Sequence, residues 1–336
     1  MTATEIPGGQ LISTDAAARM ILSGRALRIA GEESALRKLP KGLWIGGSIP
    51  YFMTSDGGMC CRERVYVAEL PAFCGVPSIG SYDASTIEQI ASDAPENGFS
   101  VLIVPAFTEV HQRFARDAPD FDQMYERPLV GWVSGLHLDD LNKQKPVVVM
   151  GPTGEFFHDQ GVAMHVPLSD QYLPSVELVN LFQAGDGPVI QFDESGFTAT
   201  QAFVDGSAVE LASYVEEKKL DTRLPLVADY CGAAINVSFQ SVDSEAGRVT
   251  FYAPVFAGVE YRLAAPLESY ADALLKEAEA IDSSGTAFSC NCILNYLYGE
   301  LEGRTAGHLN GPMTFGEIAY QLVNQTLVRL RVEQMT

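Results

Sequence analysis

Two segments of the chain begin with the same Phe-Ser pair and continue as apolar runs, FSVLIV at residues 99–104 and FSCNCI at residues 288–293. Short apolar runs of this length are typical of strands that are buried on both faces. Cys290 and Cys292 stand where the first segment has valine and isoleucine, two residues apart and therefore on one face of a strand. Because free cysteine packs as a small hydrophobe, we predict that both thiols are buried in a core strand. Cys290 also stays open as a ligand contact.

Further pairs of segments match at an almost constant offset, which indicates an internal duplication. The pairs are LPKGLWIGGSI from Leu39 with LPLVADYCGAAI from Leu224, RVYVAELPAF from Arg64 with RVTFYAPVF from Arg248, SYDASTIEQI from Ser81 with SYADALLKEA from Ser269, and PLVGWVSG from Pro128 with PMTFGEIA from Pro312. In the same comparison Cys231 stands opposite Ile45. Each copy is predicted to contain a short helix, a strand, a hairpin, a second helix, a buried strand and two last strands.

The sequence therefore predicts an α+β fold of two pseudo-repeated lobes, with mixed and antiparallel sheets covered by helices. We place the N-terminal lobe at residues 1–150, a connector at 151–204 and the C-terminal lobe at 205–336. The predicted helices include residues 15–22, residues 208–215, a helix after Ser269 as N-cap, and a helix whose capping box pairs Ser85 with Glu88.

The acidic charge of the chain, −21 in 336 residues, excludes several classes of partner. Nucleic acids and anionic membranes bind through an excess of Lys and Arg, and no basic run offsets the charge locally. The longest apolar runs, such as residues 101–107, are too short for a spanning helix of about 20 residues. The first 20 residues lack the pattern of a secretion signal, and the six cysteines are scattered. We expect a cytoplasmic protein that contacts neither nucleic acid nor a membrane.

No cofactor can be assigned from motifs. The nucleotide-binding and hydrolase patterns are missing, and zinc would need four N or S ligands at a regular spacing. The five histidines form no close pair, and a single one as an axial ligand of haem remains an alternative. Cys60 and Cys61 are predicted in a hairpin tip, where Arg62 and Arg64 could lower a thiol pKa; whether these thiols are redox active stays open.

Four polar residues stand inside apolar segments and are candidates for a ligand site. They are Asp229 in LVADYCG, Arg262 in VEYRLA, Asn291 in FSCNCI and Glu317 in FGEIAY. A buried polar group without a partner costs several kcal/mol, so each should meet either a partner or a ligand. A purely structural network is the alternative for each of them.

The last 50 residues resemble the C-terminal part of the FIST domain, a bacterial sensory module. The residues that carry the resemblance are Phe315-Gly316-Glu317-Ile318, Asn324-Gln325-Thr326-Leu327 and Cys290, with weaker likeness at Val204–Val215 and Ile45–Ile49. The chain departs from the family at Ile293, where an arginine is expected. The resemblance implies a sensory protein that binds a small molecule, such as an amino acid, and a haem-binding branch also exists. Because no output domain follows, we expect a stand-alone protein that signals through a separate partner.

The favoured interpretation is a sensor with a small-molecule pocket in the second copy or between the lobes. Its predicted walls are Trp132, Phe315 and Tyr320, and its predicted polar groups are Glu317, Asn291, Arg262, Cys290 and Asp229. We specifically expect Glu317 in the pocket and not on the surface, because the first copy has Val133 there. The alternatives are an enzyme that uses Cys290 or Glu317 on a small metabolite, and a scaffold without a ligand.

Overall fold

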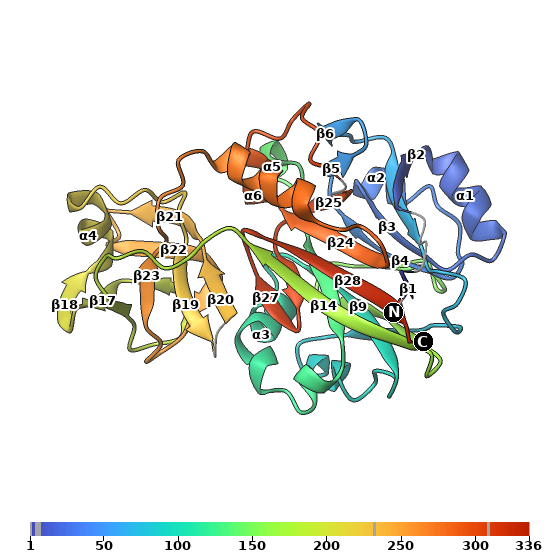
Figure 1. Cartoon of the computed structure of the whole chain (residues 1–336), viewed down its shortest axis with the longest axis horizontal. Helices are drawn as coiled ribbons and strands as arrows, with labels where there is room; N and C mark the ends of the chain where they lie inside the picture. Colours follow the sequence, from blue (N-terminus) through green and yellow to red (C-terminus); the bar gives the residue numbers. More distant parts are fainter. Residues whose placement is uncertain (1, 4–7, 231–232, 308–309, 336) are drawn as a thin grey trace.

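The computed structural model describes residues 2–3, 8–230, 233–307 and 310–335. It consists of a large main body and a smaller lobe at one end (Figure 1). We call residues 190–263 the small lobe and the other described residues the main body. The sheets are mixed and antiparallel with few helices, which confirms the coarse fold prediction and makes the fold predominantly β. Cys231 and His308 lie outside the described residues.

The first sheet of the main body contains one parallel strand pair. Its strands in order are β27 (Gln321–Val323), β26 (Glu317–Ala319), β10 (Leu129–Ser134), β9 (Gly98–Pro105), β13 (Gly161–Pro167) and β8 (Ser78–Tyr82). β9 and β10 are parallel, and α3 (Glu109–Asp117) connects them; the other neighbours are antiparallel.

The second sheet repeats this local arrangement. Its strands in order are β1 (Thr2–Ala3), β28 (Thr326–Gln334), β24 (Thr286–Cys292), β25 (Gly311–Thr314), β5 (Tyr51–Thr54) and β6 (Gly57–Cys60), and β14 (Tyr172–Asn180) also pairs with β28. β24 and β25 are parallel and are connected through α6 (Ile293–Tyr298), while β28 is antiparallel to β24. The two segments that share Phe-Ser, β9 and β24, therefore have equivalent neighbours in two sheets.

A third sheet completes the main body. It has the order β12 (Glu155–Phe157), β11 (Val148–Met150), β4 (Trp44–Ser48), β3 (Leu27–Gly31), β7 (Val65–Glu69) and β2 (Gln10–Ile12). Besides α3 and α6, the described helices of the main body are α1 (Thr14–Leu22), α2 (Glu33–Leu36), η1 (Ile87–Ile90), η2 (Ala118–Asp120), η3 (Met124–Glu126), η4 (Leu138–Asp140) and α5 (Tyr270–Ala280).

The small lobe has two antiparallel sheets of its own. One has the order β18 (Ser207–Glu210), β17 (Gln201–Val204), β15 (Ile190–Gln191), β23 (Tyr261–Leu263), β19 (Leu226–Tyr230) and β20 (Ala233–Val237). The other has the order β16 (Gly196–Ala199), β22 (Arg248–Val255) and β21 (Phe239–Asp243), and α4 (Leu211–Glu217) packs beside them. A separate apolar core, which includes Phe251 and Tyr261, holds this lobe together.

The structure does not show the two pseudo-repeated lobes that the sequence predicts. β25 pairs with β5 and β10 pairs with β26, so strands from both predicted lobes share the first and the second sheet. The match at Leu39 and Leu224 also ends in different surroundings, because β4 lies between β3 and β11 whereas β19 lies between β20 and β23. The segment expected to be a connector supplies β13 and β14, which pair with β9 and β28. Backbone pairing over such distances leaves no local signal in a sequence.

Local sequence signals held at some helix ends and failed at others. Ser269 accepts a hydrogen bond from the Asp272 N–H at 3.2 Å, which confirms it as the N-cap of α5. The capping box at Ser85 was wrong: the Asp83 carboxylate accepts the Ser85 N–H at 2.8 Å instead, and only the short η1 follows. The helix predicted at residues 208–215 begins at Leu211, after β18.

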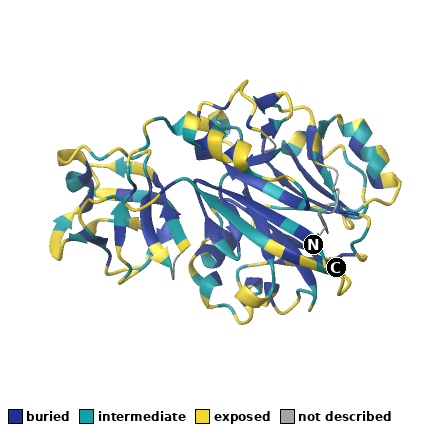
Figure 2. Cartoon of the chain, viewed as in Figure 1, coloured by how far each residue is buried: buried dark blue, intermediate teal, exposed yellow. Residues whose placement is uncertain are grey.

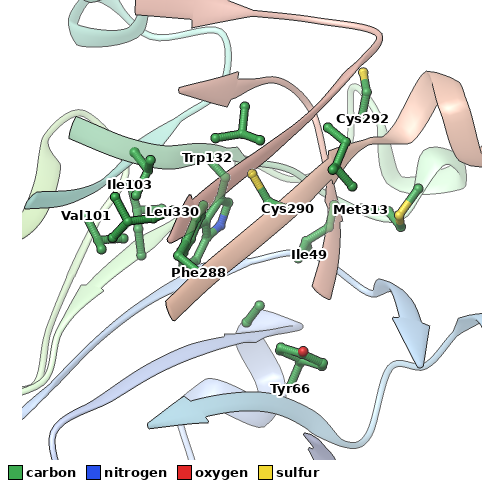
Figure 3. Packing of buried hydrophobic residues seen from close by; sticks show 14 of the residues in the cluster. Ile49, Tyr66, Val101, Ile103, Trp132, Phe288, Cys290, Cys292, Met313 and Leu330 are labelled. Carbon is green, nitrogen blue, oxygen red and sulfur yellow. The ribbon is translucent and has the colours of Figure 1, made fainter. Parts of the chain in front are cut away.

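The core of the main body lies where its three sheets meet. Cys290 and Cys292 are buried with about 1% exposure, which confirms that part of the prediction. The Cys290 thiol donates to the Gly131 carbonyl oxygen at 3.2 Å, and Figure 3 shows it beside Trp132. Gly47 on β4 allows the third sheet to pack closely against the first, because a Cβ at this position would lie 2.7 Å from Cγ2 of Ile103 on β9. Figure 2 shows the buried residues concentrated in these central strands.

In the part of the chain that the structure describes, no helix combines the length and the apolar character needed to cross a membrane.

Candidate functional site

A cleft of about 640 Å³ lies where the main body meets the small lobe. We call it the interlobe cleft. Its main-body walls include Phe107, Leu138, Leu297 and Phe315, and its small-lobe wall includes Tyr252. Volumes of this size are typical of pockets for small organic molecules.

The interlobe cleft lies at the carboxyl ends of both parallel strand pairs. β9 ends at Pro105 and β10 at Ser134, and the loops that follow them line the cleft. β24 and β25 end at Cys292 and Thr314, and the next residues in the chain, at the start of α6 and at Phe315, also line it. Open α/β sheets bind ligands at this end of their strands. The placement therefore follows from the strand directions of the two sheets.

Phe107 has a strained backbone at the edge of the cleft. Its φ is 64°, in the left-handed region that bulky residues rarely adopt, and its side chain is half exposed. Thr108 holds the turn, because its hydroxyl donates to the Pro105 carbonyl at 2.7 Å and accepts the His111 N–H at 3.3 Å. The ring meets that of Phe315 edge-on, with 6.1 Å between centroids. Strain of this kind is concentrated at functional sites.

A second cavity of about 230 Å³ shares Phe107, Tyr252 and Phe315 with the cleft and extends it to His111 on α3. The imidazole of His111 is buried, and neither ring nitrogen has a hydrogen-bond partner among the described residues. Burial lowers the pKa of His111 to about 4, so the ring is neutral at neutral pH. A neutral imidazole can donate one hydrogen bond and accept another. The extended cleft thus offers apolar walls with one polar group at depth.

Polar side chains surround the outer part of the interlobe cleft. Asn142, Gln144, Lys145, Asp159 and Gln240 line it beside the apolar walls. The arrangement suits a mainly apolar molecule that carries a few hydrogen-bonding groups.

A buried polar network joins the small lobe to the main body next to the cleft. Asn236 and Asn180 exchange side-chain hydrogen bonds of 2.9 and 3.0 Å. Ser238 donates its backbone N–H to Asn324 Oδ1 at 3.1 Å. Gln325 donates to the Arg223 carbonyl at 2.9 Å. Because hydrogen bonds are directional, this network stabilises the arrangement of the two parts that this structure shows.

Two of the segments that carry the FIST resemblance, residues 315–318 and residues 324–327, contact each other beside this network. Glu317 Oε2 accepts hydrogen bonds from the Thr326 hydroxyl at 2.9 Å and from its N–H at 3.3 Å. Burial raises the pKa of Glu317 to about 8, against the smaller effects of Thr326, Cys292 and Thr314. Glu317 is fully buried, so it is not on the surface, but it lines none of the cavities described here. The carboxyl group holds the Asn324–Thr326 turn against β26.

Cys290 and Asn291 lie in the same interior region as Glu317. Burial raises the pKa of the Cys290 thiol well above its usual range, with the nearby Glu317 as a smaller cause. Asn291 Oδ1 accepts from Asn295 Nδ2 at 2.7 Å, and Asn291 Nδ2 has no partner among the described residues. Of the cavities described here, the one that both residues line is a void of about 10 Å³. That space is too small for an organic ligand.

The other predicted site residues are dispersed. Arg262 and Asp229 lie in the small lobe, where Arg262 donates to the Gly187 carbonyl and Asp229 is exposed. Tyr320 forms the β26–β27 turn, with its ring 5.7 Å from that of Tyr125. Trp132 lines a cavity at the opposite end of β24. Of the predicted walls, only Phe315 lines the interlobe cleft, so the structure does not gather the predicted set into one site.

Sequence reasoning missed most of the residues that form the cleft. Phe107, His111 and Tyr252 follow no chemical motif. The signal available was Thr108, a good N-cap directly after the apolar strand, which predicts a strand-to-helix junction and so the start of α3. The side chains that line a pocket at such a junction are set by the fold and leave no pattern of their own.

The prediction that Cys60 and Cys61 lie in a hairpin tip was wrong, because the hairpin turns between Thr54 and Gly57, and Cys60 pairs with Tyr51 at the other end of β6. Burial raises the pKa of Cys60. Burial acts in the same direction on Cys61, but hydrogen bonds from Arg64 and Glu63 together outweigh it, so the pKa of Cys61 is lowered. The lowering expected from neighbouring arginines therefore holds for Cys61 only. Within the described ranges there is no cluster of three His, Cys, Asp or Glu side chains that could hold a metal ion.

A family model described as a family of unknown function (DUF6976) matches residues 12–333. No curated protein and no solved structure matches the chain.

Proposed function

The chain belongs to the DUF6976 family of unknown function, and we propose that it is a cytoplasmic sensory protein that binds a small molecule in the interlobe cleft. The observation that carries the proposal is the cleft itself, about 640 Å³ at the carboxyl ends of two parallel strand pairs and walled by both parts of the molecule. A ligand there contacts the main body and the small lobe together. Its chemistry is mainly apolar, with a group that hydrogen-bonds to the neutral His111.

The sensory part of the proposal rests on two further arguments. A ligand that touches both walls binds most tightly to the position of the small lobe that brings these walls together. It therefore favours that position over any other that the small lobe adopts. The residues of the FIST resemblance, Glu317 and Asn324, support the same junction by contacting Thr326 and Ser238. The signal would then pass to a separate protein that recognises the position of the small lobe.

The enzyme alternative finds less support in the geometry. A nucleophilic cysteine needs a lowered pKa and contact with the substrate. Burial raises the pKa of Cys290 well above its usual range, and Glu317 is enclosed with its Oε2 bonded to Thr326. Neither side chain lines the interlobe cleft.

The proposal can be tested with the neutral apolar fluorophore N-phenyl-1-naphthylamine and with native mass spectrometry. Leu297 lies on α6, lines the cleft and is 40% exposed, so Leu297→Glu places a charge in the cleft without burying it. We expect the variant to bind the fluorophore about tenfold more weakly and to lose any small molecule that co-purifies with the parent.

The matched control is Leu22→Glu, the same change at a residue of α1 that is 73% exposed. It should bind the fluorophore as the parent does. Equal binding by Leu297→Glu and the parent, at equal thermal stability, would place the apolar site elsewhere.

A further inference from the structure

Another cavity, chemically different from the interlobe cleft and its extension, lies at the opposite end of β24. It has a volume of about 190 Å³ and lies among strands of all the main-body sheets. Its principal lining residues are Arg28 on β3, Tyr66 on β7, Trp132 on β10, Phe288 on β24 and Arg329 on β28. β24 has seven residues, so about 20 Å of strand separates the two sites. The exposed residues Gly8 and Ser283 also line this cavity and connect it to the surface.

The two arginines of this cavity differ in how their charge is balanced. Arg329 Nη1 lies 3.1 Å from Glu177 Oε2, and its Nη2 donates to the Thr286 hydroxyl at 2.7 Å. Arg28 is only 3% exposed and forms no ion pair among the described residues. Its Nη2 donates to the Glu69 carbonyl at 3.3 Å, while Nε and Nη1 are buried without a hydrogen-bond partner there. Arg28 therefore carries a charge that its described surroundings do not balance.

The ionisable neighbours of Arg28 do not supply a negative charge. Burial raises the pKa of Cys74 to about 11 and raises that of Tyr66 further still, so both are neutral at neutral pH. Arg28 remains cationic there, because burial lowers its pKa only to about 10. A buried cation without a counter-charge costs several kcal/mol. The unpartnered Nε and Nη1 of this buried cation point to an external anion.

The walls of the cavity indicate the rest of the ligand. The rings of Trp132 and Phe288 are stacked, with 6.0 Å between centroids and 19° between planes. The guanidinium carbon of Arg28 lies 5.8 Å from the centroid of Phe288. These faces favour a planar ring, and a dry cavity of about 150 Å³ suffices for benzene. One uncompensated positive charge matches a monoanion better than a phosphate dianion, and a guanidinium fits a carboxylate in shape.

We propose that this cavity binds a small planar carboxylate, a single aromatic ring bearing one acid group, with the carboxylate on Arg28 and the ring against Phe288. The site is separate from the interlobe cleft and does not depend on the function proposed for it.

The test uses isothermal titration calorimetry with benzoate, 4-hydroxybenzoate and nicotinate, and with benzamide and inorganic phosphate as comparison probes. We expect at least one of the carboxylates to bind the full chain with a Kd of about 1 mM or tighter. Benzamide has the same shape without the charge, and it should bind about tenfold more weakly or worse. Phosphate as tight as the best carboxylate, or no carboxylate binding at about 10 mM, overturns the proposal.

Arg28→Met removes the charge and keeps much of the chain length, and Arg25→Met is its matched control. Arg25 is an exposed arginine just before β3 that pairs with Glu69 at 3.0 Å. Arg28→Met should weaken carboxylate binding about tenfold or more, whereas Arg25→Met should not change it. Without ligand, Arg28→Met should melt at the same temperature as the parent or higher, because it relieves an unbalanced charge. Equal carboxylate binding by Arg28→Met and the parent overturns the proposal.

Two further measurements keep the interpretation distinct. Arg28→Met should bind N-phenyl-1-naphthylamine as the parent does. The carboxylate site and the interlobe cleft are therefore tested separately, and either proposal can fail without the other. Glu5 stands four residues before Gly9 in the sequence and is outside the described part of the chain. Glu5→Gln should bind the carboxylate as the parent does. If the variant binds the carboxylate and the parent does not, Glu5 balances the charge of Arg28 in the parent, and the proposal is overturned.

Discussion

The buried carboxyl group of Glu317 should make the stability of this protein depend on pH in a direction unusual for an acid. Burial raises its pKa from 4.5 to about 8. Between these values the folded chain holds a proton that the unfolded chain has released. The free energy of unfolding therefore falls as pH rises through this window, by about 1.4 kcal/mol per unit, and levels off above it. From about pH 5.5 to pH 8 the expected loss is about 3 kcal/mol.

Glu317→Gln should remove this pH dependence. Glutamine keeps the shape, its oxygen can accept from Thr326, and its NH₂ group can replace the donor of the protonated acid. The nearby thiols of Cys290 and Cys292 do not titrate in the window, because burial raises the pKa of each well above its usual value. Relative to the parent, the variant should therefore gain about 3 kcal/mol between about pH 5.5 and pH 8.

Urea unfolding followed by fluorescence at several pH values measures this difference. Glu277→Gln is the matched control, since Glu277 is exposed on α5 and the change removes the same formal charge. Its pH profile should run parallel to that of the parent. If the profile of Glu317→Gln is also parallel to that of the parent, Glu317 is ionised in the fold and the reasoning fails.

Three other changes test the site. The lowered pKa of His111, about 4, should make the free energy of unfolding of the parent fall by about 3 kcal/mol as pH falls from about 7 to 4. His111→Leu should remove this loss, and urea unfolding that shows the same loss in the variant would contradict the reasoning. Phe107→Gly should relieve the positive φ, leaving stability unchanged or raising it by about 1 kcal/mol, while fluorophore binding falls; a clear loss of stability would mean that the ring is structural. Asn324→Ala leaves the Ser238 N–H without its acceptor and should cost about 1–3 kcal/mol, with faster hydrogen exchange at the junction of the small lobe; unchanged exchange would rule out a role in joining the two parts.

The sequence predicted those features that depend on neighbouring residues. The buried strands at Phe99 and Phe288 are present, because apolar content and length are local properties. The N-cap at Ser269 is present for the same reason. The pairing of β10 with β26 and of β25 with β5 could not be read, since strand partners are chosen by the whole fold. Individual strands and helix ends were therefore predictable from the sequence, whereas the pairing of strands from the two halves of the chain was not.

The candidate sites were predictable to a smaller extent. Polar residues in apolar segments did turn out to be buried at Glu317 and Asn291, but they bond to other parts of the chain. The same criterion applied to Leu27–Gly31 would have found Arg28, a charge inside an apolar strand. The strained turn at Phe107 gave no signal, because an aromatic residue is a poor predictor of a positive φ.

The pairing of β25 with β5 has a consequence for the synthesis of this protein. Met53 pairs with Gly311, so β5 leaves the ribosome long before its partner has been made. At about 5–20 residues per second, the roughly 260 residues between them take about 13–50 s to translate. During that time the hairpin of β5 and β6 has a free edge, and unpaired edges invite association with other chains. The edge of β5 that β25 covers in the finished fold therefore stays unpaired until the last part of the sequence has emerged.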